Sequence, residues 1–501
     1  MIHAFLQGLG TLGSPMVMLA LALGSVIGVI IGIIPVIGPL ITIAILLPFV
    51  NGMSPETGLS LLIGIYAASM AGGSMTSILL NIPGDVTNAA TVIDGYPLAQ
   101  KGQAGRAMGA AILSSAMGGI LGVFLAMGMI PLALVLVLAF RAPEMFFLVL
   151  LGISVIATIG KDSLVKSLIS GFLGIILSFV GFHAITGASR FTFETTFLYD
   201  GLNLIPFILG IFALPELIEV AVKGTTISQA PVVANLTQDI MEGFKDVFRH
   251  FWLFLRSSLI GYILGVIPGI GTQVAIFVAY GQAKQFSRNP EKFGTGCIEG
   301  VIAPESANNA SQGGHMLPTL AFGIPAGAIM AVLLGAFLMV GITPGPAMLK
   351  DHLDLSFLLL IGLAVGNILS LALCFLLARW TTKIANVHAD FLLPIIVAIT
   401  FIGTYVAREE LLDLIVLLLA TVLGSAMLKF NYSRPALILG FILGKLAEKY
   451  FFLSLSAFGP LFFLSPLCLV LIVLTVILLF SRQLGRVFQR FPRGGPSGHE
   501  A

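Results

Sequence analysis

The chain is a series of long apolar runs separated by short polar segments. The runs show no sustained alternation of polar and apolar positions. A membrane helix needs roughly 20 apolar residues, whereas a membrane-spanning strand needs a two-residue alternation. The pattern therefore predicts an all-α integral membrane protein with roughly ten to twelve transmembrane helices. The apolar blocks cover residues 15–50, 57–80, 107–139, 143–160, 163–182, 203–222, 252–267, 328–343, 355–379, 391–407, 411–428, 434–447 and 460–481.

Composition strengthens this interpretation. The chain is 57% hydrophobic and 10% charged, with a mean hydropathy of +1.06, whereas a soluble domain carries about 25% charged residues. Cys297, Cys374 and Cys468 are far apart and lack metal-ligand spacing, so we expect small buried side chains. A net charge of +2 gives no indication of a nucleic-acid partner.

The most polar internal segment divides the chain into two halves. We expect a first membrane repeat over residues 1–222, a polar connecting segment over 223–250, a second membrane repeat over 251–481 and a basic tail over 482–501. The tail carries four arginines beside an apolar block, so the positive-inside rule places the C-terminus in the cytoplasm. The N-terminus lacks the basic region of a secretory signal, so we expect the first helix to stay in the mature protein.

The two halves share a series of helix-breaking motifs. The sequence IIPVIG at Ile33–Gly38 matches VIPGIG at Val266–Gly271. Downstream, GGSM beginning at Gly72 matches GGHM beginning at Gly313, and each is followed by Ile-Pro. The spacing between the glycine pair and that proline differs by one residue between the halves. We interpret these motifs, glycine pairs included, as breaks in membrane helices that face one another.

Broken helices are expensive in hydrocarbon unless protein, water or a ligand takes the freed backbone groups. A helix start offers N–H groups to a carboxylate, and a helix end offers carbonyl oxygens to a cation. Paired breaks in related halves indicate the midplane site of a secondary transporter. The predicted substrate-binding residues are Gly72, Gly73, Ser74, Thr76, Asn309, Ser311, Gln312, Gly313, Gly314 and His315. The predicted cation-binding residues are Pro35, Gly38, Asp85, Asn88, Pro268, Gly271, Glu305 and Asn308, with Na⁺ as the expected ion.

Several of these residues have a second interpretation. Asp85 follows Pro-Gly and also suits a helix cap. The Ser, Thr and Asn side chains also suit hydrogen bonds between helices, and His315 also suits a structural role. Glu144 and Glu216 each follow a proline, which is typical of the first turn of a helix. No HExxH, GxSxG or P-loop lysine motif is present, so we expect neither catalytic residues nor a cofactor.

Two long motifs resemble a known family. Ile82–Gly109 (IPGDVTNAATVIDGYPLAQKGQAGRAMG) and Gly265–Gly327 resemble the two signatures of the large membrane subunit of tripartite tricarboxylate transporters. The likeness extends from about Gly24 to about Tyr450. It implies a bacterial inner-membrane importer that works with a small four-helix membrane subunit and a periplasmic substrate-binding protein.

The resemblance further implies two inverted repeats, elevator-type movement and a homodimer. It implies uptake of citrate-like di- or tricarboxylates, driven by an ion gradient that is usually Na⁺. Two alternatives stay open: a proton-coupled importer of another organic acid, such as an aromatic carboxylate, and a channel or scaffold subunit. The first half has no counterpart of PESANN, which begins at Pro304, so we expect two chemically unequal half-sites.

Overall fold

The computed structural model describes residues 1–34, 38–154, 164–183, 187–223, 236–268, 271–381 and 389–476. These residues are almost all helical, and a hairpin of β1 (Gly181–Phe182) and β2 (Ser189–Arg190) is the one sheet among them. Five helical segments are long and apolar enough to cross a membrane, and several shorter helices are also apolar. The prediction of an all-helical chain with membrane-spanning segments is confirmed at this level. Residues 482–501 and Pro35 lie outside the described residues.

Two pairs of closely packed helices form the centre of the molecule. In the first pair, α2 (Pro15–Ile33) lies along α4 (Pro55–Leu80), and in the second, α13 (Phe251–Val266) lies along α15 (Glu299–Phe322). Small residues permit this approach. A Cβ at Gly32 would meet the carbonyl oxygen of Ser69, and one at Gly265 would meet the carbonyl oxygen of Ser311. Such stripes of small residues are typical of helix pairs in membranes.

The glycine contacts of the two pairs correspond position by position. A Cβ at Gly72 would meet the carbonyl oxygen of Val29, and one at Gly314 would meet the carbonyl oxygen of Tyr262. Gly72 is therefore the counterpart of Gly314, and its alignment with Gly313 in the sequence is wrong by one residue. In the corrected register, the glycine and the following Ile-Pro are equally spaced in both halves.

The helix ends follow the same register. Asn81, with φ 60°, caps the end of helix α4, and Gly323, with φ 66°, caps the end of α15. Each of these left-handed residues directly precedes Ile-Pro, which cannot continue a helix. The breaks therefore lie at the Ile-Pro motifs.

Two further helices cross between the pairs. Helix α6 (Ala104–Leu138) packs against α15, and α18 (Leu353–Leu377) packs against α4. A Cβ at Gly118 would meet Ser306, and one at Gly366 would meet Ala67. Helices α6 and α18 also contact each other. Each half thus contributes a long helix that covers the central helix of the other half.

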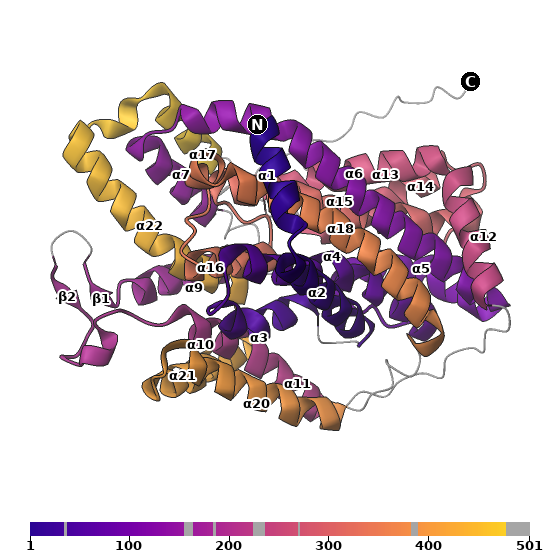
Figure 1. Cartoon of the computed structure of the whole chain (residues 1–501), viewed down its shortest axis with the longest axis horizontal. Helices are drawn as coiled ribbons and strands as arrows, with labels where there is room; N and C mark the ends of the chain where they lie inside the picture. The colour runs from indigo at the N-terminus through magenta and orange to yellow at the C-terminus, as the bar shows by residue number, and fades with distance from the viewer. Residues whose placement is uncertain are drawn as a thin grey trace, which may run out of the picture.

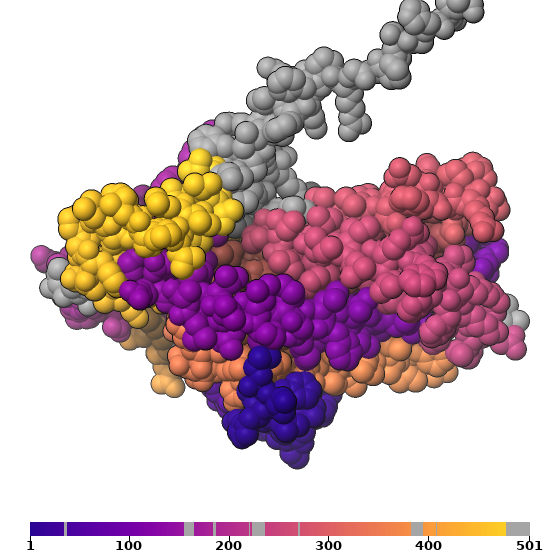
Figure 2. Space-filling model, turned by 90° about the horizontal axis from the view of Figure 1, so that it is seen from above, coloured from indigo at the N-terminus to yellow at the C-terminus, as the bar shows by residue number. Residues whose placement is uncertain are grey.

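Several of the other helices form a second group beside this centre. Figure 1 shows α22 and the β-hairpin at one end of the long axis and α12 at the other. Figure 2 shows the N-terminal segment, in indigo, projecting from one side. The second group comprises α7 (Ala142–Ser154), α9 (Leu164–Ser178), α10 (Leu204–Ile208), η4 (Leu209–Ala213), α11 (Leu214–Lys223), α20 (Ala389–Arg408), α21 (Leu412–Lys429) and α22 (Arg434–Phe458).

Short helices connect the two groups. Helix α3 (Pro39–Val50) contacts η4 and α20, and α16 (Ala328–Met339) contacts α22. Each of them follows one of the breaks, so the broken segments lie where the two groups meet. The other short elements are α1 (Ile2–Leu12), η1 (Val86–Asn88), α5 (Ala89–Leu98), η2 (Ala99–Gln103), η3 (Thr196–Leu198), α14 (Gly271–Phe286), η5 (Pro290–Lys292), α17 (Pro346–Asp351), η6 (Ala378–Trp380) and η7 (Phe462–Leu464).

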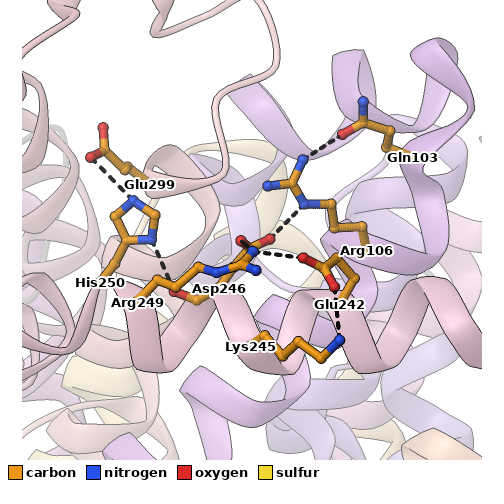
Figure 3. Close-up of polar contacts among 8 residues, drawn as sticks. All are labelled: Gln103, Arg106, Glu242, Lys245, Asp246, Arg249, His250 and Glu299. Carbon is orange, nitrogen blue, oxygen red and sulfur yellow. Dashed lines mark hydrogen bonds and ion pairs between the residues drawn. The ribbon is translucent and has the colours of Figure 1, made fainter.

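The described part of the expected connecting segment is an amphipathic helix, α12 (Leu236–Arg249), which packs against α6. Asp246 accepts from Arg106 Nε at 2.5 Å, and Glu242 accepts from Arg249 at 2.6 Å (Figure 3). The hydrogen bond from Arg249 lowers the pKa of the exposed Glu242 carboxyl. This polar cluster fixes α12 to one end of the helical centre.

Candidate functional site

A cavity of about 770 Å³ lies where the broken helices of both halves meet the second group. The first half contributes both of its breaks to the wall, and so does the second half. A single space therefore receives both sets of broken helices, as the repeated motifs predict. The residues from the breaks are Gly38, Ile82, Pro83, Gly84, Asp85, Gly271, Thr272, Ala326 and Gly327.

Several helices begin at this cavity. Helix α3 begins after Gly38, α14 at Gly271, α16 after Gly327 and α22 after Ser433, and these residues all line the wall. The first N–H groups of a helix have no partner inside that helix, and its start carries roughly half a positive charge. The convergence of four helix starts favours an anion in the cavity, whereas the Asp85 carboxylate on the same wall opposes it.

One ion pair also lines the cavity. Arg434, at the start of α22, pairs with Glu216 in the first turn of α11, and its guanidinium lies 5.4 Å from the Phe212 ring centroid. The sequence correctly placed Glu216 in a first turn, but its partner was missed. A lone arginine before a proline gives no sequence signal, because α11 and α22 come together only in the fold.

Asp85 has a local partner that explains its position. Its Oδ1 accepts the N–H of Thr87 at 3.0 Å and caps η1. The capping interpretation of this residue is therefore confirmed. Its carboxylate also lines the cavity, together with Gly38.

The glycine pairs do not break helices, and that expectation is wrong. Gly72 and Gly73 lie inside continuous α4, and Gly313 and Gly314 lie inside continuous α15. Their N–H groups belong to the hydrogen bonding of the helix and are not free to hold an anion. The physical reason for these glycines is close packing, since a Cβ at Gly313 would meet the backbone of Gly122.

Most of the predicted polar substrate ligands are buried between helices. Gln312 Nε2 donates to the Tyr66 carbonyl at 2.8 Å and Asn309 Nδ2 donates to Asn367 Oδ1 at 2.8 Å. Thr76 Oγ1 donates to the carbonyl of Gly73 at 3.0 Å. Gln312 and Asn309 thus join helices, as the alternative interpretation of the sequence holds, whereas the Thr76 bond stays within α4.

His315 is the predicted substrate ligand that reaches the cavity wall. Its Nδ1 lies 2.9 Å from the hydroxyl of Tyr66, and its Nε2 lies 3.4 Å from the hydroxyl of Thr272. The same Thr272 hydroxyl lies 2.7 Å from Ser311 Oγ. The imidazole is therefore held between α4 and α14 at the cavity wall.

The predicted cation ligands do not come together in one place. Gly38, Asp85 and Gly271 line the cavity, while Pro268 lies in the turn that follows α13. Glu305 and Asn88 lie deeper, and each forms a hydrogen bond with the hydroxyl of Ser74. Asn308 is fully buried, and neither atom of its side-chain amide has a hydrogen-bond partner among the described residues.

Broken membrane helices from both halves of a chain that meet at one cavity are typical of membrane transporters. The chain belongs to the tripartite tricarboxylate transporter TctA family, whose sequence model matches residues 18–439. It is therefore the large membrane subunit of a bacterial transporter that works with partner subunits, and it is a transport component and not an enzyme.

Two proteins of Agrobacterium vitis are similar to this chain. An uncharacterized 52.8 kDa protein in the TAR-I ttuC' 3' region is 36% identical over 444 residues, which cover 88% of each chain. An uncharacterized protein in the TAR-II ttuC' 3' region is 37% identical over 190 residues, which cover 38% of this chain and 78% of the relative. No solved structure matches the chain.

Proposed function

We propose that the chain is the translocating subunit of a binding-protein-dependent secondary transporter that imports di- or tricarboxylates, with citrate-like anions as the substrate class. The cavity between the two sets of broken helices carries this proposal, because helix starts from both halves converge on it. Family membership supports the same substrate class.

The carboxylate would be held mainly by main-chain N–H groups. Arg434 is already paired with Glu216, so the fixed positive charge left for the anion is that of the helix starts. His315 and Thr272 supply side-chain contacts on the same wall. Such partial charges bind an anion without making its release prohibitively slow.

The negative charge of the bound carboxylate must be compensated before the substrate can cross the membrane. We propose that one or more cations, with Na⁺ as the coupling ion, move with the anion. One elementary charge moved through 100 mV gains roughly 2.3 kcal/mol. Binding more cations than the anion has charges would let the membrane potential drive accumulation.

The family suggests how the parts work together. We propose a periplasmic binding protein that delivers the anion, a small four-helix membrane subunit beside this chain, and a homodimer in the inner membrane with the C-terminus in the cytoplasm. We further propose that the halves are inverted repeats and that the central helices move against the second group. The position of the cavity between these two groups supports this elevator-like movement.

Apolar side chains on the cavity wall favour a second substrate class. Ile41, Met70 and Met330 contribute apolar surface to the same space. This surface suits the ring of an aromatic carboxylate as well as the carbon chain of a tricarboxylate. A substrate panel must therefore contain both kinds of acid.

The test is reconstitution of the chain with both partner subunits in liposomes. Uptake of labelled citrate and of a labelled aromatic carboxylate would be measured with and without the binding protein, under gradients of Na⁺ or choline. We expect saturable uptake that needs the binding protein and the Na⁺ gradient. Conductance that does not saturate and needs no binding protein would instead identify a channel, and uptake driven by protons alone would remove Na⁺ coupling.

A further inference from the structure

A second polar site lies behind the cavity, around Glu305 of α15. Its side chain is fully buried. Oε2 accepts hydrogen bonds from Ser74 of α4 at 2.6 Å and from Ser115 of α6 at 2.7 Å, and Oε1 accepts one from Thr91 of α5. Four helices, drawn from both halves of the chain, thus converge on one carboxylate.

This carboxylate has no ion pair with any residue that the structure describes. Its known partners are three hydroxyl groups and the Asn88 side-chain amide, which are all neutral and stabilise an anion without cancelling its charge. A carboxylate inside a membrane protein without a cationic partner is strongly unfavourable and marks a functional position. One monovalent cation beside the Glu305 carboxylate would therefore neutralise its charge.

Two asparagines near Glu305 carry unpaired amide atoms. Asn88 donates through Nδ2 to Ser74 Oγ and to the Met70 carbonyl, both at 3.0 Å, and its buried Oδ1 has no partner among the described residues. Asn308 lies one turn from Glu305 on α15, and both of its amide atoms are likewise unpaired in the described structure. Buried polar atoms without partners point to a group that the site can still receive.

We propose that Glu305, Ser74, Thr91 and Ser115 form a binding site for one Na⁺ ion, with the Asn88 amide at its edge. Carboxylate and hydroxyl oxygens are ligands that hard cations prefer. A single carboxylate balances a monovalent ion, whereas a divalent ion would leave a buried positive charge. On binding, the hydroxyl hydrogens turn away from the carboxylate and the oxygens take the cation.

This inference rests on the proposed function, because it assigns the coupling cation to a place separate from the anion. Under this proposal Ser74, which the sequence predicted as a substrate ligand, binds the cation instead. The cavity residues Asp85 and Gly271, which were predicted as cation ligands, do not bind it. Asn88 connects the two sites, since it is the last residue of η1, which Asp85 caps at the cavity wall. An ion at Glu305 would therefore order the segment that the anion touches.

The test uses the purified full-length chain in detergent, without substrate or partner subunits. Its thermal unfolding midpoint is measured against NaCl, with choline chloride keeping the ionic strength constant, and binding of ²²Na⁺ is measured in parallel. We expect a saturable rise of the midpoint with Na⁺. Ser115→Ala and Thr91→Val should each raise the half-saturating Na⁺ concentration roughly tenfold, because each removes one contact to a charge. Glu305→Gln should abolish saturable binding.

Ser114→Ala is the matched control. Ser114 is the buried neighbour of Ser115, and its hydroxyl has no hydrogen-bond partner in the described part of the chain. Its substitution should leave the Na⁺ response unchanged. Should Glu305→Gln fail to fold, the titrations of Ser115→Ala and Thr91→Val decide the question alone.

Two results would overturn the site: equal Na⁺ responses in Ser114→Ala and Ser115→Ala, or stabilisation of the wild-type chain that follows pH and ignores Na⁺. Either can occur while Na⁺-driven carboxylate uptake is intact, which leaves the proposed function standing. Conversely, Na⁺ binding that needs Glu305 in a reconstituted system without carboxylate uptake would support the site and reject the proposed substrate.

Discussion

The hydroxyl oxygen of Tyr66 in α4 lies 2.9 Å from Nδ1 of His315 in α15. In the register set by the helix packing, the counterpart of Tyr66 is Asn308 and the counterpart of His315 is Gly73. One half thus supplies a tyrosine where the other supplies an asparagine. Two similarly packed halves therefore present different chemistry at their centre, as expected from the missing PESANN counterpart.

The contact between Tyr66 and His315 should matter for substrate affinity. Tyr66→Phe removes the hydroxyl that orients the imidazole, so we expect KM for the carboxylate to rise about two- to tenfold, the value of one neutral hydrogen bond. Uptake into proteoliposomes over a range of substrate concentrations measures it. Tyr262→Phe is the control, because the Tyr262 hydroxyl is buried without a partner among the described residues. Equal effects of the two substitutions would contradict the role given to Tyr66.

Substitution of the paired glycines should lower the stability of the chain, because these glycines serve helix packing. A Cβ at Gly72 or Gly314 would meet the backbone of α2 or α13, and overpacking of this kind costs about 1–3 kcal/mol. Gly72→Ala and Gly314→Ala should therefore both lower the unfolding midpoint of the purified chain. Gly281→Ala is a suitable control, since nothing lies within 4 Å of the added atom. A midpoint unchanged in Gly72→Ala would indicate that α2 and α4 are less closely packed.

The sequence predicted the helical membrane fold and the Ile-Pro breaks because both depend on local backbone chemistry. It misplaced the glycine pairs because glycine serves helix breaks and close packing equally well, and only contacts distinguish the two. Because both motifs begin with two glycines, the sequence alignment matched Gly72 with Gly313. The helix packing matches Gly72 with Gly314, one residue later. Thr91, Ser115 and the partner of Glu216 could not be found, because they meet their neighbours through tertiary packing.

Cys297 should react slowly with alkylating reagents. It lies in the loop before α15, and burial raises the pKa of its thiol to about 11. Little thiolate exists at pH 8, so we expect slow maleimide labelling that rises about tenfold per pH unit below that pKa. The measurement uses a variant in which Cys374 and Cys468 are replaced by alanine. Rapid labelling at pH 7.5 would show that the loop leaves the thiol exposed.

Asp94 should limit the access of reagents to Cys297, because it holds the loop before α15 in place. Its Oδ1 accepts the N–H groups of Gly294, Gly296 and Cys297 at 2.9, 2.8 and 2.8 Å, and its Oδ2 accepts the hydroxyl of Tyr280 at 2.8 Å. Asp94→Ala removes every one of these acceptors. We therefore expect faster labelling of Cys297 at any given pH, together with a lower unfolding midpoint. Labelling at the unaltered rate would show that other contacts hold the loop.

The ion pair at the cavity gives a prediction with a definite sign. Arg434 faces the cavity but is neutralised by Glu216. Glu216→Gln frees the guanidinium to attract an anion, so KM for the carboxylate should fall, whereas Arg434→Gln should raise it. Each change is expected to be roughly tenfold, the value of one hydrogen bond to a charged group. Since each substitution acts through the other residue, the double variant should lie between them.

The matched control for this prediction is the ion pair of Arg190 and Glu448. It is also a close ion pair, with 2.6 Å between Arg190 Nη1 and Glu448 Oε1 and 2.9 Å between Nη2 and Oε2, but neither residue lines the cavity. Glu448→Gln should therefore leave KM unchanged, although it removes the same charge from the chain. If Glu448→Gln and Glu216→Gln lowered KM equally, the effect would come from net charge at the membrane surface. That result would contradict binding of the carboxylate in the cavity. A lower KM in Glu216→Gln alone would place the carboxylate within reach of Arg434.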